Sequence, residues 1–193
     1  MNRLLKGFME RNTSFSEEEL QAIMKDIVIE TYRKNTILLK QGEISNQCYF
    51  VLNGCIRQYF IGDDGKEVTV NFFTEEQAVV IFKSYKNKVQ SDYFLTCCEE
   101  STLVVGTLES EESMYRDFPA IEKFTRAMIE QNFGEEQEER ARFIAAAPEE
   151  RYRILLKQRP GLINRVPQHQ LASYLGITPE SLSRIKKRIS QVR

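Results

Sequence analysis

The sequence has no long apolar run. Its longest uninterrupted apolar stretches, which include 48–52 and 78–82, have five residues, whereas a membrane-spanning helix needs about 20. The first residues, MNRLLKGFMERN, lack the apolar core of a secretory signal peptide. The sequence therefore argues against a membrane protein, and we expect a cytoplasmic one.

Metal-ligating residues are scarce as well. The four cysteines are Cys48, Cys55, Cys97 and Cys98, and they contain no Cys-x-x-Cys pair. A zinc site needs clustered Cys and His ligands, and an iron–sulfur site would need all four thiolates to converge. Free cysteines of a cytoplasmic protein are more often small buried hydrophobes. We expect no metal and no cofactor, and the redox role of these thiols stays open.

Histidine is almost absent, since His169 is the only one. It has no nucleophile motif around it, so a Ser-His-Asp or Cys-His catalytic pair is not predicted. Residues 28–108 contain no histidine, which disfavours a cupin-like metalloenzyme on a β-domain. We expect a protein that is not an enzyme.

Net charge is also small, −1 for the whole chain, which taken alone argues against a nucleic-acid partner. The charge is unevenly spread, however: residues 148–193 hold ten basic and three acidic side chains. That segment is +7 and the remainder is −8. Such asymmetry suggests that one part binds a polyanion, although a solvated basic helix face would look the same.

From residue 28 to residue 108 the chain alternates short apolar runs with turn signals. The strands predicted from these runs are 28–32, 36–39, 47–52, 55–61, 66–73, 78–81, 93–98 and 103–108. Asn53-Gly54 predicts a hairpin turn, because both residues of such a turn need positive φ; Asp64-Gly65 is a further turn signal. Many short strands at this spacing favour a sandwich or barrel, including a jelly roll.

Helical patterns flank this region. Residues 15–27 have a capping box at Ser16 and Glu19, and 109–118 read as a short helix. A longer helix is predicted over 119–147, with Pro119 in its first turn. Its first half carries the apolar residues Ile121, Phe124 and Met128. This stripe can pack on the β-domain or form a dimer seam, and the helix length favours the seam.

Three further helices are predicted after Pro148, and the last two form the most specific motif, VPQHQLASYLGITPESLSRIKKRI over 166–189. Gly176 suits the left-handed conformation after a helix end, and Thr178 and Pro179 suit the start of the next helix. Leu182, Ile185 and Ile189 share the inner face of the second helix. The arrangement predicts a DNA-binding helix-turn-helix, with a generic helical hairpin as the alternative.

The polar face of the second helix carries the side chains that base edges and phosphates require. The predicted DNA-binding residues, including one from the preceding helix, are Gln168, Thr178, Glu180, Ser181, Ser183, Arg184, Lys187 and Arg188.

In its order of parts the chain resembles the Crp/Fnr (cyclic-AMP receptor) regulators of bacteria. The matching segments are ILLKQG at 37–42, CYFVLNG at 48–54 and Gly65, followed by the long helix and the helix-turn-helix. The resemblance implies an α+β fold: a cyclic-nucleotide-binding-like β-roll (a jelly roll) over 1–118, a dimerisation helix over 119–147 and a helix-turn-helix domain over 148–193. It further implies a homodimer on a palindromic site in double-stranded DNA. RNA polymerase and an unidentified small-molecule effector in the roll are further partners that it allows.

The chain departs from the family where cyclic AMP binds. Members that bind it carry Phe-Gly-Glu and a later Arg. The corresponding segments of this sequence are TEEQAVVI at 74–81 and QSDY at 90–93. No arginine lies between Arg57 and Arg116. Lys83, Lys86 and Lys88 offer positive charge without the fork geometry of arginine. We therefore expect no response to cyclic AMP through the family's mode.

The predicted helix-turn-helix also departs from the family's sequence pattern. Glu180 and Arg184 match the family's reader pattern, but Pro179 stands where an arginine is usual. The chain ends at Arg193, so we expect an incomplete wing. The leading function is a sequence-specific transcription regulator. A β-roll module for a ligand or protein, with a relict helix-turn-helix that binds no DNA, is the alternative.

Overall fold

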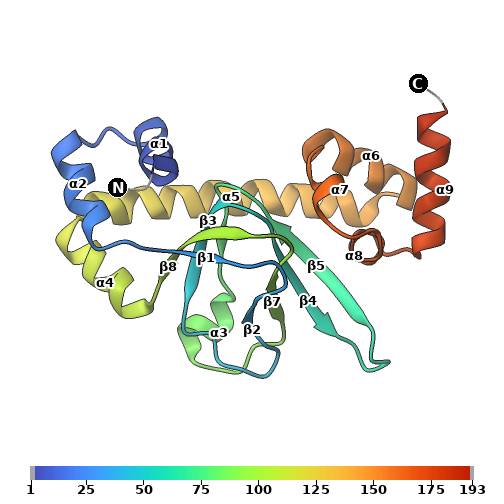
Figure 1. The fold of residues 1–193 in the computed structure, drawn as a ribbon, viewed down its shortest axis with the longest axis horizontal. Helices are drawn as coiled ribbons and strands as arrows, with labels where there is room; N and C mark the ends of the chain where they lie inside the picture. Colours follow the sequence, from blue (N-terminus) through green and yellow to red (C-terminus); the bar gives the residue numbers. More distant parts are fainter. Residues whose placement is uncertain (1–2, 192–193) are drawn as a thin grey trace. The chain divides into compact units, whose positions relative to one another are not determined.

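The computed structural model describes residues 3–191, with the side chains of 131–136, 138 and 139 outside the description. The α+β class is confirmed, with strands confined to the N-terminal part and helices on both sides of them (Figure 1). The strands are β1 (Val28–Tyr32), β2 (Ile37–Leu39), β3 (Cys48–Asn53), β4 (Ile56–Ile61), β5 (Glu67–Phe73), β6 (Ala78–Val79), β7 (Phe94–Cys97) and β8 (Ser101–Gly106). The helices are α1 (Arg3–Asn12), α2 (Glu17–Lys25), α3 (Phe82–Asn87), α4 (Leu108–Asp117), α5 (Pro119–Ala145), α6 (Pro148–Gln158), α7 (Leu162–Arg165), α8 (Gln168–Leu175) and α9 (Pro179–Ser190).

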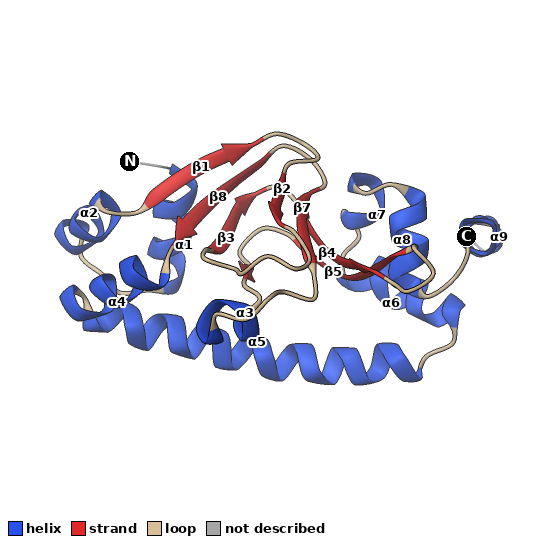
Figure 2. Ribbon diagram, turned by 90° about the horizontal axis from the view of Figure 1, so that it is seen from below, coloured by secondary structure: helices blue, strands red, loops and turns tan. Residues whose placement is uncertain are grey.

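The strands form two sheets, in the orders β1-β8-β3-β6 and β2-β7-β4-β5 (Figure 2). In the first sheet β3 lies between β8 and β6, and Tyr49 is opposite Val105 on one side and Val79 on the other. Because side chains alternate along a strand, Tyr49 and Val51 enter the interior of the roll while Phe50 points to the outer face. The predicted jelly-roll-like domain is therefore confirmed.

The interior of the roll is filled by its own side chains. Ten buried residues form this core: Leu39, Tyr49, Val51, Ile56, Val79, Ile81, Leu95, Cys97, Leu103 and Val105. Tyr32 and Tyr93 pack against it, and the Tyr32 and Tyr49 rings meet edge to face with centroids 6.5 Å apart. The Tyr49 hydroxyl donates to Gln47 Oε1 at 2.8 Å, so this polar group is satisfied inside the core.

The prediction of a hairpin at Asn53-Gly54 is wrong. The strands on either side, β3 and β4, belong to different sheets, so the turn passes the chain from one sheet to the other. Gly54 has φ +116°, and a Cβ at this position would lie 2.3 Å from Ser101 Oγ. Glycine is required here by close approach of the backbone as well as by φ. The Asp64-Gly65 signal does form a hairpin, between the neighbouring strands β4 and β5.

Three helices were not predicted: α1, α3 and α7. Helix α1 buries Leu5, Phe8 and Met9 in a second core on the outer face of the first sheet. Leu20 and Ile23 of α2, Leu52 of β3 and Ile121 of α5 complete this core. The capping box of α2 is present as predicted: Glu19 N donates to Ser16 Oγ and Ser16 N donates to Glu19 Oε2.

The chain divides into two compact units. The first comprises 1–58 and 72–129, and the second comprises 59–71 and 130–193. The second unit therefore includes the tip of the β4–β5 hairpin as well as the C-terminal helices, and α5 is continuous from one unit into the other. In the described part of the chain, no helix is long and apolar enough to cross a membrane.

Candidate nucleic-acid interface

Helices α8 and α9 and the turn between them form the predicted helix-turn-helix. Gly176 adopts φ +71° and its N–H donates to the Ser173 carbonyl at 3.0 Å, while Ile177 N donates to Ala172 O at 3.0 Å. Thr178 caps α9, because Ser181 N donates to its Oγ1 at 3.2 Å. These bonds satisfy the ends of both helices and fix the angle at which α9 leaves the turn.

The two faces of α9 differ sharply in exposure. Leu182 is 0% exposed and Ile185 is 5% exposed, and Leu171, Ala172 and Leu175 of α8 are also buried. Of the predicted DNA-binding residues, seven are exposed and Ser181 is half-buried. The exposed ones are Gln168, Thr178, Glu180, Ser183, Arg184, Lys187 and Arg188. Because the apolar side of α9 is packed against α8, its polar side faces solvent, as a helix that enters a DNA groove requires.

Some of these side chains already have partners. Gln168 Nε2 donates to Ser183 Oγ at 2.5 Å and to Pro179 O at 3.3 Å, which ties the start of α8 to the start of α9. Arg188 Nη1 lies 3.3 Å from Glu149 Oε2 of α6. An Arg188 contact to a phosphate would therefore exchange this ion pair for a new one.

Glu180 is positioned to remain ionised. Hydrogen bonds from its own backbone N–H and from Thr178, together with the nearby Arg184 charge, lower the pKa of its carboxyl. A carboxylate in the first turn is also favoured by the helix dipole. Glu180 can therefore act only as a hydrogen-bond acceptor at neutral pH, which is the role it needs toward a cytosine amino group.

Arg151 of α6 is a residue that the sequence analysis missed. Its guanidinium donates to three carbonyls: Ala146 O at 3.0 Å, Ile144 O at 3.1 Å and Leu175 O at 3.1 Å. The first two lie at the C-terminal end of α5 and the third is the last residue of α8. Its guanidinium carbon also lies 5.6 Å from the centroid of the Phe143 ring. Arg151 therefore joins the end of α5 to the helix-turn-helix, and only its basic character was visible in the sequence.

The tip of the β4–β5 hairpin contacts α8 within the second unit. Thr69 N donates to Ser173 Oγ at 2.9 Å, and the same hydroxyl donates to Glu67 O at 3.1 Å. The Ser173 hydroxyl therefore bonds one backbone N–H and one backbone carbonyl of β5. This explains why residues 59–71 belong to the same compact unit as α8.

The predicted dimerisation residues lie in the first unit. Ile121 is only 8% exposed and is part of its second core. Phe124 and Met128 pack partly against the same core, with the Phe8 and Phe124 rings 6.1 Å apart. Phe124 and Met128 therefore keep some exposed surface, while Ile121 keeps little.

Comparison with known proteins supports these observations. A family described as "Cyclic nucleotide-binding domain" matches residues 29–110. The nitrogen fixation regulation protein FixK of Rhizobium meliloti (strain 1021) is 24% identical over 171 residues, which cover 85% of this chain and 76% of that protein. The chain is therefore similar to the Crp/Fnr regulators in sequence.

Solved structures share the fold of this chain. FixK2 from Bradyrhizobium japonicum matches with a TM-score of 0.70 at 15% identity, covering 86% of this chain and 85% of that one. The c-di-GMP-responsive global regulator CLP of Xanthomonas campestris matches with a TM-score of 0.68 at 15% identity, covering 91% and 92%. The catabolite activator protein of Thermus thermophilus matches with a TM-score of 0.53 at 19% identity, covering 92% and 85%.

The lysines considered as substitutes for a phosphate-binding arginine have other neighbours. Lys83 Nζ lies 3.9 Å from Asp92 Oδ2, and Lys86 Nζ lies 3.5 Å from Glu111 Oε2. Lys88 Nζ lies 5.4 Å from the centroid of the Tyr85 ring. With these partners and a roll interior filled by apolar and tyrosine side chains, an anionic phosphate would be buried without a paired cation, which is unfavourable.

Proposed function

We propose that this protein is a sequence-specific DNA-binding transcription regulator that acts as a homodimer on a palindromic site. The observation that carries the proposal is the geometry of α9: a buried stripe of Leu182 and Ile185 holds an exposed face of Arg, Lys, Glu and Ser. The C-terminal segment that contains this face carries a net charge of +7. Charge of this sign is what phosphate binding needs.

Arg184 is the residue we assign to a base edge. It is exposed on the polar face of α9, and a guanidinium pairs bidentately with guanine. The alternative function is a ligand- or protein-binding β-roll module with a helix-turn-helix that no longer binds DNA. It is favoured by Pro179, which occupies a position where the family usually has an arginine.

Binding-site selection with the purified chain, followed by fluorescence anisotropy on the selected duplex, tests the proposal. We expect Arg184→Ala to weaken specific binding by about 1–3 kcal/mol, roughly 5- to 150-fold, and to relax one base preference. The matched control is Arg33→Ala, which removes the same charge from an exposed position in the first unit. Recovery of no preferred sequence at low salt would favour the alternative, and equal losses for both variants would refute the assignment to Arg184.

We further propose that the regulator does not respond to cyclic AMP. The roll core occupies the interior with Tyr49 and its neighbours, and the three lysines have the partners described above. Calorimetry is expected to show no micromolar binding of cyclic AMP. Binding that is lost on Tyr49→Trp, a change that adds bulk inside the roll, would contradict this.

A further inference from the structure

A hollow of about 470 Å³ lies on the outer face of the first sheet, entirely within the first unit. Its floor includes Phe50 and Val104 of the sheet, and its walls include Phe8 of α1, Met114 of α4 and Phe124 of α5. The volume is in the usual range for small-molecule sites, which are mostly apolar with a few converging polar groups. Phe50 and Val104 belong to the second core, on the opposite face of the first sheet from the roll core. The hollow is nevertheless also bordered by Tyr49 and Val105 of the roll core.

The helix beside the hollow is only partly covered. In α4 none of the residues Leu108–Asp117, all of which the structure describes, is buried, although Met114 and Tyr115 line the hollow. An amphipathic helix that packs on a core normally buries such residues. Met114 and Tyr115 pack against the second core but stay partly exposed, and a ligand in the hollow would cover the exposed part.

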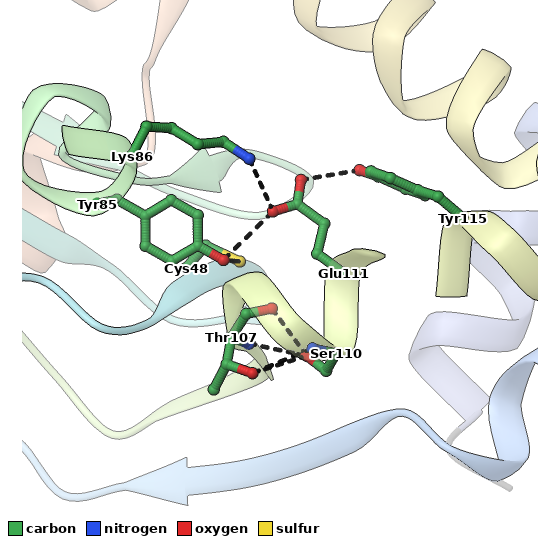
Figure 3. A network of polar contacts seen from close by, with 7 residues as sticks. All are labelled: Cys48, Tyr85, Lys86, Thr107, Ser110, Glu111 and Tyr115. Carbon is green, nitrogen blue, oxygen red and sulfur yellow. Dashed lines mark hydrogen bonds and ion pairs between the residues drawn. The ribbon is translucent and has the colours of Figure 1, made fainter. Parts of the chain in front are cut away.

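One end of the hollow is polar, because Tyr85, Lys86, Glu111 and Tyr115 line it. Figure 3 shows the contacts among these side chains. Glu111 Oε2 accepts a hydrogen bond from the Tyr85 hydroxyl at 3.2 Å and lies 3.5 Å from Lys86 Nζ, and Glu111 Oε1 accepts from the Tyr115 hydroxyl at 3.0 Å. Burial raises the pKa of Tyr115 to about 12, so its hydroxyl stays protonated and donating at neutral pH. The Tyr85 hydroxyl is also 3.7 Å from Cys48 Sγ.

The donor count leaves one acceptor position unused. A carboxylate offers about four lone-pair sites, two on each oxygen. Among the described residues, Oε2 has two donors and Oε1 has only Tyr115. Oε1 of Glu111 can therefore accept one more hydrogen bond from a group placed in the hollow.

The charges at this end select against a charged ligand. Lys86 already neutralises Glu111, so a second cation would meet Lys86 and an anion would meet Glu111. An uncharged group with an N–H or O–H avoids both repulsions and still fills the unused position on Oε1. The apolar floor and walls require the rest of the molecule to be apolar.

We propose that this hollow binds an uncharged amphiphile: a molecule with an alkyl or similarly apolar body that ends in a hydroxyl or a primary amide. At roughly 30 Å³ per heavy atom, the volume holds on the order of 15 such atoms. The apolar body lies on Phe50 and Val104, and the polar end donates to Glu111 Oε1. The site does not depend on the proposed DNA binding.

Isothermal titration calorimetry of the full chain with octanamide tests the site. Methyl octanoate has the same chain without the N–H donor, and octanoate and octylammonium add a charge of either sign. We expect octanamide to bind, and each of the other three to bind at least fivefold more weakly. No octanamide binding, or tighter binding of octanoate or octylammonium, would overturn the proposal, and this comparison needs no variant to fold.

Variants then locate the site. Val104→Phe fills the hollow from the floor and Ser113→Phe fills it from α4; each is expected to weaken octanamide binding at least tenfold. Val68→Phe makes the same change on β5, outside the hollow, and should leave binding unchanged. Thermal melts check that each variant folds.

Unchanged octanamide binding in Val104→Phe and Ser113→Phe proteins that fold refutes the location of the site. Light scattering that shows weaker dimerisation of Val104→Phe, in a chain that binds no octanamide, assigns the hollow to a second copy instead.

Discussion

Arg151→Met is the substitution that most directly tests how the helix-turn-helix is held. It keeps much of the apolar stem of Arg151 but removes the three donors to Ala146 O, Ile144 O and Leu175 O. A hydrogen bond from a charged donor contributes about 1.5–3 kcal/mol. The bond to Ile144 is exposed and contributes less, and the three are not additive. The expected loss is about 3 kcal/mol in the free energy of unfolding of the second unit.

A loss of this size is easy to measure. For a unit of fewer than about 100 residues it lowers Tm by roughly 10–20 °C. Hydrogen exchange by mass spectrometry on the full chain resolves the effect by region, and the amides of α8 and α9 should lose protection while those of β3 and β8 keep theirs. Arg151→Lys is the control, because it keeps the charge but its single ammonium nitrogen cannot replace the three guanidinium nitrogens that donate to the three carbonyls.

Two results would refute the reasoning. The first is an Arg151→Met protein whose α8 amides exchange as slowly as those of the wild type. The second is complete rescue by Arg151→Lys, which would mean that charge near the helix C-termini is sufficient and that the three-way bonding is not needed.

Three further predictions concern stability and thiol chemistry. Gly54→Ala should destabilise the roll far more than Gly42→Ala in urea unfolding, because a Cβ at Gly54 would lie 2.3 Å from Ser101 Oγ and one at Gly42 meets nothing within 4 Å. Leu182→Ala should lower the free energy of unfolding by about 2–5 kcal/mol, since its side chain is 0% exposed; a loss below 1 kcal/mol would mean a loose core. Burial raises the pKa of Cys97 to about 11, so its thiolate fraction at pH 8 is about one in a thousand. Iodoacetamide should therefore spare Cys97 in the native protein, as read by mass spectrometry, and label it in urea.

The features that the sequence predicted well are set by neighbouring residues. The turn of the helix-turn-helix depends on Gly176 at positive φ and on Thr178 as a cap, and both act within a few residues of their own position. The hairpin at Asp64-Gly65 is of the same kind. Local chemistry decides such structures, so a short stretch of sequence is sufficient to find them.

The features that it missed depend on distant partners. Asn53-Gly54 carries the same dipeptide signal as a hairpin turn, yet the strands beside it, β3 and β4, pair with β8 and β7, which lie much further along the chain. The role of Arg151 depends on three carbonyls from two other helices. Nothing in the residues around Arg151 distinguishes it from a solvated arginine.

The apolar stripe of α5 shows a further reason why sequence alone falls short. An apolar stripe indicates that a helix face is covered but does not say by what. Ile121 is buried in the second core of its own chain, so Ile121→Ala would loosen the first unit whether or not it touched a partner. Met128 only borders that core and keeps exposed surface. Met128→Glu therefore separates the two roles: if the proposed dimer seam includes Met128, light scattering should show a monomer while thermal melts show that the Ile121 packing is kept. An unchanged dimer would exclude Met128 from the seam.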